Sequence, residues 1–66
     1  MKYRIKCIKK NVYYSGTLFK GQYHWTFDEP YIFKEAQDVL DKIIEIVSIK
    51  RLTIDDLVIE RVKWEN

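Results

Sequence analysis

The two residue types that most often carry catalytic or metal chemistry each occur once, as His24 and Cys7. A metal ion needs further ligands beside one imidazole, and a catalytic thiolate needs a base held close to it. His24 alternates with aromatic residues, which predicts an extended segment with the imidazole on its solvated face. Cys7 alternates with Tyr3 and Ile5, which predicts a small buried hydrophobe. The sequence therefore predicts no metal, no cofactor and no enzymatic activity.

Neighbouring carboxylates and glycines would be the other sources of chemistry. Asp55 and Asp56 are adjacent, and adjacent residues on a helical turn do not face each other. Because they follow Thr53, they fit the cap of a short helical turn better than a catalytic pair. Gly16 and Gly21 stand alone in predicted turns, so they do not form a glycine-rich phosphate loop.

A basic segment opens the chain. Lys2, Arg4 and Lys6 recur at every second position, which places them on one face of a strand. Further lysines follow in a turn, and two tyrosines follow the turn. The candidates for nucleic-acid binding are Lys2, Arg4, Lys6, Lys9, Lys10, Tyr13 and Tyr14. Cations on phosphates and rings stacked on bases would hold a single strand, and an ordinary solvated sheet face is the alternative.

Acidic residues are confined to residues 25–66, whereas residues 1–24 hold basic residues and no acid. This asymmetry indicates either an acidic or nucleic-acid partner or an attraction between two elements of the fold, and we favour the second. Four of the acids form the outer face of a predicted helix: Glu35, Asp38, Asp41 and Glu45. This face is either simply solvated or an acidic strip that binds a basic protein surface.

The helix that organises the chain is predicted over residues 33–49. Its apolar residues recur three and four positions apart, the spacing of one buried stripe. They are Phe33, Ala36, Leu40, Ile43, Ile44 and Val47, with Val39 and Ile46 widening the stripe. We expect Leu40, Ile43, Ile44 and Val47 to pack against Ile5 and Cys7.

Strands are predicted on both sides of this helix. The segments with period-two alternation or β-forming residues are 2–8, 12–14, 17–19, 23–27 and 57–64. Ser15 and Gly16 are expected to break the second segment from the third. Turns are expected at residues 9–11 and 20–22, where Asn11 and Gly21 tolerate positive φ. Tyr23, Trp25 and Phe27 are expected on one face of their strand.

The last strand has two competing faces. A buried Glu60 would lack an obvious partner, so we expect Leu57 and Ile59 to point inward. Val58, Val62 and Trp64 then point outward, where Glu60 can meet Arg4 or Lys6. This outward patch and the acidic strip are the candidate partner-binding surfaces, and the patch would also suit a homodimer.

The predicted order is ββ(β)αβ within one domain, residues 1–66. It is an α+β fold, with a small antiparallel or mixed sheet of three to four strands and one amphipathic helix packed on one face. The layout resembles small phage- and prophage-encoded proteins, most of which have no known activity. The pieces that carry the resemblance are residues 3–8, residues 12–14, Trp25, residues 33–40 and residues 58–62.

The resemblance implies a protein that binds and modulates, or inhibits, a host protein. Small size, many aromatic residues and the absence of catalytic motifs agree with a non-enzymatic protein-interaction module. The alternative is single-stranded nucleic-acid binding through the basic first strand. The chain shows no signal-peptide pattern and no apolar run long enough to cross a bilayer, so we expect a cytoplasmic protein without a membrane partner.

Overall fold

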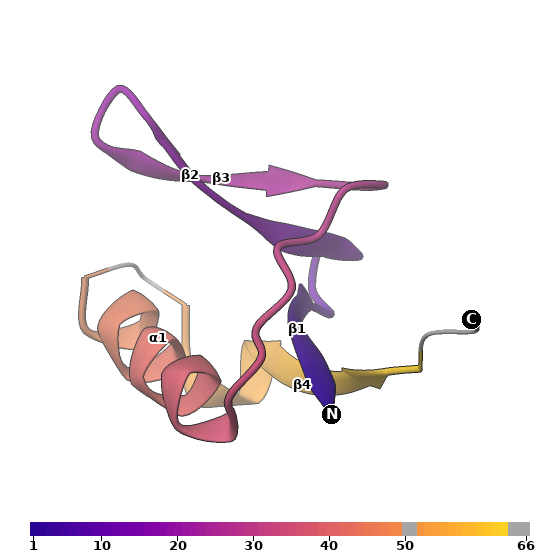
Figure 1. Ribbon diagram of the computed structural model, residues 1–66. Coiled ribbons are helices and arrows are strands. Elements are labelled where there is room, and N and C mark those ends of the chain that lie inside the picture. The colour runs from indigo at the N-terminus through magenta and orange to yellow at the C-terminus, as the bar shows by residue number, and fades with distance from the viewer. Residues whose placement is uncertain (50–51, 64–66) are drawn as a thin grey trace.

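The computed structural model describes residues 1–49 and 52–63, which form a four-stranded antiparallel sheet with one helix beside it (Figure 1). The elements are β1 (Lys2–Cys7), β2 (Val12–Phe19), β3 (Gln22–Thr26), α1 (Ala36–Ile49), the 3-10 helix η1 (Ile54–Asp56) and β4 (Leu57–Val62). The strand order is β3-β2-β1-β4. The predicted α+β fold class is confirmed, and the third strand of the predicted order is present.

Both predicted hairpin turns are confirmed. Asn11 has φ of 57° between β1 and β2. Between β2 and β3, Lys20 and Gly21 have φ of 52° and 77°, and Phe19 lies opposite Gln22. Two consecutive positive φ values in a two-residue loop are the geometry whose twist matches that of antiparallel strands.

The predicted break at residues 15–16 is wrong, because β2 continues through it. Gly16 has φ of 85°, and the register between β2 and β3 shifts between Tyr14 and Leu18. Such a bulge inserts residues on one strand and bends the strand without ending it. The prediction that Phe27 lies with Tyr23 and Trp25 on one face of a strand over residues 23–27 is wrong for Phe27. β3 ends at Thr26, and the Phe27 side chain is exposed.

The sheet divides where residues 31–33 enter it. β1 pairs with β2 at two positions, and beyond them the Tyr31 amide donates to the Tyr14 carbonyl at 2.8 Å. Tyr3 and Phe33 exchange two backbone hydrogen bonds, of 2.9 and 2.8 Å. The β2–β3 hairpin therefore rises away from the β1–β4 pair (Figure 1). Because Phe33 is held in extended pairing, the helix begins at Ala36, not at the predicted residue 33.

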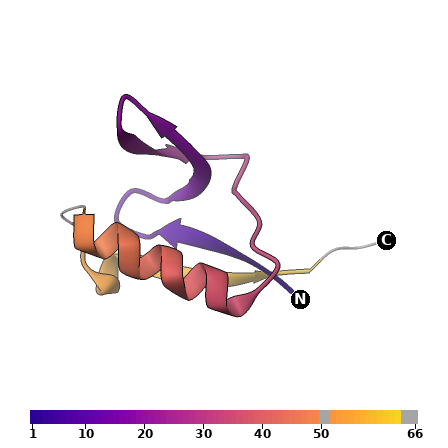
Figure 2. The same cartoon turned by 60° about the vertical axis from the view of Figure 1, so that its left-hand side comes forward.

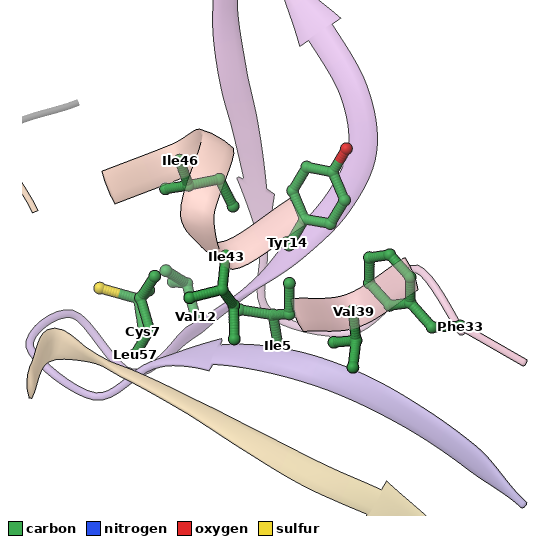
Figure 3. Close-up of a cluster of buried hydrophobic side chains, with 9 residues drawn as sticks. All are labelled: Ile5, Cys7, Val12, Tyr14, Phe33, Val39, Ile43, Ile46 and Leu57. Atoms are coloured by element: carbon green, nitrogen blue, oxygen red, sulfur yellow. The ribbon is translucent and has the colours of Figure 1, made fainter. Parts of the chain in front are cut away.

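The core lies between α1 and the sheet (Figure 3). Its buried residues are Ile5, Cys7, Val12, Tyr14, Phe33, Val39, Ile43, Ile46 and Leu57. The prediction is correct for Ile43 but wrong for Leu40 and Ile44, which are 46% and 63% exposed. Val39 and Ile46 are buried in their place, because α1 is rotated about its own axis relative to the prediction. Aromatic rings of the β2–β3 hairpin contact one flank of the helix.

Candidate functional site

The sheet face that turns away from α1 carries the basic side chains of β1. Arg4 lies opposite Glu60 of β4, and its Nε donates to Glu60 Oε1 at 2.8 Å. The Arg4 guanidinium also stacks 4.5 Å from the centre of the Tyr13 ring. The predicted contact between Glu60 and Arg4 is therefore confirmed. The Arg4 guanidinium, the most delocalised cation of this face, is already paired with Glu60 across β1 and β4. It is therefore less available to bind a phosphate.

Tyr14 is not on this face, so its choice as a nucleic-acid-binding residue is wrong. Its side chain is 6% exposed and stacks on Phe33 with ring centres 5.9 Å apart. In β2 the period of two that exposes one tyrosine buries its neighbour. The half-buried candidates that remain on the sheet face are Lys2, Lys6 and Tyr13, and Lys9 and Lys10 are exposed in the adjoining turn.

The acidic strip is exposed as predicted. Asp38, Asp41 and Glu45 are exposed on α1, and Glu35 is exposed just before its first residue. Asp41 Oδ1 accepts from Gln37 Nε2 at 2.9 Å, and Lys42 Nζ lies 3.1 Å from the Glu45 carboxylate. The sheet separates this strip from the basic face of β1. An internal attraction therefore explains the charge asymmetry for Arg4 and Glu60, which form an ion pair, but not for the acids of the helix.

Glu45 links the helix to the β2–β3 hairpin, because it accepts a hydrogen bond from the Tyr23 hydroxyl. This bond and the one from Lys42 hold the pKa of Glu45 below its ordinary value. Partial burial of the hydroxyl, together with the same hydrogen bond, raises the pKa of Tyr23 to about 12. A lowered carboxyl pKa favours the folded state above the ordinary carboxyl pKa, and that contribution is lost as the pH falls through the lowered value.

Tyr23→Phe is therefore expected to raise the pKa of Glu45, because the variant removes the largest cause of its lowering. Following the Glu45 carboxyl carbon by NMR between pH 2 and 7 measures the effect. Lys42→Met removes the second cause and should give a smaller rise. An unchanged Glu45 titration in Tyr23→Phe would show that the helix and the hairpin are not coupled through this bond.

The outward patch predicted on β4 is present in part. Val58 and Val62 lie opposite Lys6 and Lys2, on the face away from α1. Val58 is 38% exposed and Val62 is half-buried. Trp64 lies outside the described residues. The predicted inward direction of Leu57 and Ile59 is confirmed by their pairing with Cys7 and Ile5, but Ile59 is 36% exposed because β4 is at the edge of the sheet.

The backbone of β4 presents an open edge. Within residues 1–49 and 52–63, no strand lies on the side of β4 away from β1. The Ile8 amide donates to the Asp56 carbonyl at 2.9 Å. This bond shows which residues of β4 direct their backbone groups toward β1, because these residues alternate along the strand. Even-numbered residues of β4 therefore direct their N–H and C=O toward β1, and Ile59 and Arg61 direct theirs outward.

An exposed apolar stripe of α1 lies on the same side as this edge. Successive helix residues are rotated by about 100°. Lys42 precedes Ile43 and faces the β2–β3 side, where its Nζ is 5.8 Å from the centre of the Tyr14 ring. Ile44 follows buried Ile43, so it lies with Leu40 on the opposite flank of α1, away from the β2–β3 hairpin. Exposed Leu40 and Ile44 on this flank of α1, together with exposed Ile59 on the edge strand, are the residues that we call the β4-edge surface.

Sequence reasoning missed the β4-edge surface because it assigned Leu40 and Ile44 to the core. The sequence signal that could have revealed this surface is the width of the apolar arc of the helix, because one face of a sheet cannot cover the whole arc. Figure 2 shows α1 running along one side of the β1–β4 pair.

The predicted structural roles of His24 and Cys7 agree with their positions. His24 is exposed, with Nδ1 3.1 Å from Ser15 Oγ, and Cys7 is buried. In the described parts of the chain, no group of His, Cys, Asp and Glu is placed to hold a metal ion, and no helix has the length and apolarity to cross a membrane. Comparison with protein-family models, curated proteins and solved structures finds no match.

Proposed function

We propose that the protein is a non-enzymatic protein-binding module that receives an extended polypeptide segment at the β4-edge surface. The observation that carries the proposal is the open edge of β4 beside exposed Leu40 and Ile44. A strand added at such an edge bonds to the outward groups of Ile59 and Arg61. The apolar side chains then provide the anchor that backbone hydrogen bonds alone do not give.

The chemistry of this surface favours a polypeptide over a nucleic acid. Leu40, Ile44 and Ile59 offer neither a cation for phosphates nor an aromatic ring for bases. An apolar partner side chain loses contact with water on reaching them, which favours binding by roughly 25 cal/mol per Å² of apolar area covered. The acidic strip on the neighbouring face of α1 would steer a partner with basic residues beside its extended segment.

In its most specific form, the proposal is that the module also binds a host protein and modulates the activity of that protein. The resemblance in layout to small phage- and prophage-encoded proteins supports this form. The second candidate function is single-stranded nucleic-acid binding on the sheet face of Lys2, Lys6 and Tyr13. It is favoured by one observation, which is that no helix covers this face among the described residues.

The test is to pan a library of displayed peptides against the immobilised full chain and to map each binder by amide hydrogen exchange. Binders are expected to slow the exchange of the Ile59 and Arg61 amides. Ile44→Lys is expected to weaken these binders at least tenfold, since a charge replaces an apolar contact. Phe27→Lys is the matched control, because it makes the same change at another exposed apolar residue.

Titration with labelled oligonucleotides at low and moderate salt distinguishes the two candidates. Salt-dependent binding that Lys6→Glu abolishes and Ile44→Lys leaves intact would replace the protein-binding proposal. Peptide binders that protect other amides than those of the β4 edge would contradict its placement.

A further inference from the structure

We infer that the extended segment received at this edge is β4 of a second copy, in a symmetric antiparallel pair centred on Ile59. This inference rests on the proposed function, because it requires the β4-edge surface to be a docking surface. The charges at the two ends of β4 are of opposite sign. Asp55 and Asp56 precede the strand, and Arg61 and Lys63 lie at its end. In an antiparallel pair, the acidic beginning of each strand lies beside the basic end of the other.

Like charges exclude three neighbouring registers of such a pair. Centring on Glu60 sets two glutamates opposite each other, and centring on Arg61 sets two arginines opposite each other. Centring on Val58 sets Asp56 opposite Glu60 of the second copy. Like charges directly opposite each other destabilise an antiparallel pair.

The register centred on Ile59 avoids all of these contacts. It places Ile59 opposite Ile59 of the second copy and Leu57 opposite the aliphatic stem of Arg61. It also directs η1 of each copy, which carries Asp55, toward Lys63 at the end of β4 of the other copy. Because the axis is twofold, each of the last two contacts occurs twice.

The backbone and the helix fit the same register. The N–H and C=O of Ile59 point outward, so the two central residues exchange both of their hydrogen bonds. The two sheets become continuous, and both helices lie on the same face of the combined sheet. Leu40 and Ile44 of each copy then cover the central Ile59 pair, which removes exposed apolar surface from both copies.

Single cysteine substitutions along β4 test the register of the pair between the two copies directly. Cα atoms of a hydrogen-bonded antiparallel pair are about 5.5 Å apart, which a disulfide can bridge. Under mild oxidation, Ile59→Cys is expected to form a covalent dimer, whereas Val58→Cys and Glu60→Cys are not, because their symmetry mates are offset along the strands. The parent chain, whose Cys7 is buried, is the control and should remain uncrosslinked.

Sedimentation of the full chain over a dilution series measures the association. Ile59→Lys is expected to raise the dimer dissociation constant at least tenfold, because it removes the central apolar contact and sets two lysines opposite each other. Phe19→Lys makes the same change on the exposed hairpin tip and should leave the association unchanged.

Three results would overturn the inference. A chain that stays monomeric at millimolar concentration, yet still binds peptides at the Ile59 and Arg61 amides, would exclude the second copy and leave the proposed function standing. A stronger crosslink at Val58 or Glu60 would show another mode of association. If the full chain neither dimerises nor binds peptides at the β4 edge, both the inference and the proposed function are wrong.

Discussion

Ile46→Ala is expected to lower the free energy of unfolding by about 2–5 kcal/mol. The Ile46 side chain is 0% exposed and belongs to the core beneath α1. The variant loses buried apolar contacts and leaves a cavity that the surrounding side chains fill only in part. A domain of this size has a total stability of roughly 3–10 kcal/mol, so much of the protein should be unfolded near 37 °C. Urea denaturation followed by circular dichroism measures the loss.

Ile44→Ala is the matched control, because it makes the same truncation two residues away on the same helix. Its side chain is 63% exposed, so the change in unfolding free energy should stay within about 0.5 kcal/mol. Both variants are compared at a dilution at which sedimentation shows the monomer. Equal losses for the two variants would show that the helix is rotated differently about its axis.

Gly16→Ala is expected to be the most damaging of the small surface substitutions, with a loss of about 2–4 kcal/mol. Gly16 has φ of 85°, a conformation that costs an L-residue with a side chain about 1–2 kcal/mol. A Cβ at this position would also lie 2.4 Å from Cδ1 and 2.8 Å from Cγ of Tyr31. Tyr31 cannot withdraw easily, because its amide is bonded to the Tyr14 carbonyl and its ring packs on Phe33 at 4.8 Å.

Gly21→Ala separates the two contributions to this loss. Gly21 also has a positive φ, of 77°, but nothing lies within 4 Å of an added Cβ. The control should therefore lose only the conformational part, about 1–2 kcal/mol. A melting temperature lowered further for Gly16→Ala than for Gly21→Ala measures the clash with Tyr31. Equal shifts would show that the segment of residues 31–33 gives way to the added methyl group.

The elements of the fold could be predicted because each has a local cause. Period-two alternation marks β1, and a glycine after a lysine marks the β2–β3 turn. Which face of β4 points inward followed from one electrostatic argument, the cost of burying Glu60 without a partner. In the structure Glu60 lies on the outward face, where Arg4 is its partner. In each of these cases, residues close in sequence or one ion pair decide the outcome.

The rotation of α1 could not be predicted, because it depends on contacts distant in sequence. Leu40 and Ile44 have the same apolar character as Val39 and Ile46, so the helix pattern alone does not choose between them. The choice is made by the β2–β3 hairpin, where Tyr23 reaches Glu45 and the Tyr14 ring lies near Lys42. The β4-edge surface was missed for the same reason, since it consists of the residues that this rotation leaves uncovered.

The pairing of β1 with β4 also determines when the protein can fold during its synthesis. Arg4 and Glu60 are 56 positions apart, a length that a ribosome synthesises in roughly 3–11 s at about 5–20 residues per second. Until residue 62 has emerged, β1 lacks β4, and Ile5 and Cys7 lack the cover of Leu57. An unpaired strand with apolar side chains invites aggregation, and flanking charges such as Lys2 and Lys6 oppose it. The basic residues of β1 are therefore placed to oppose aggregation of the nascent chain before β4 is available to pair with β1.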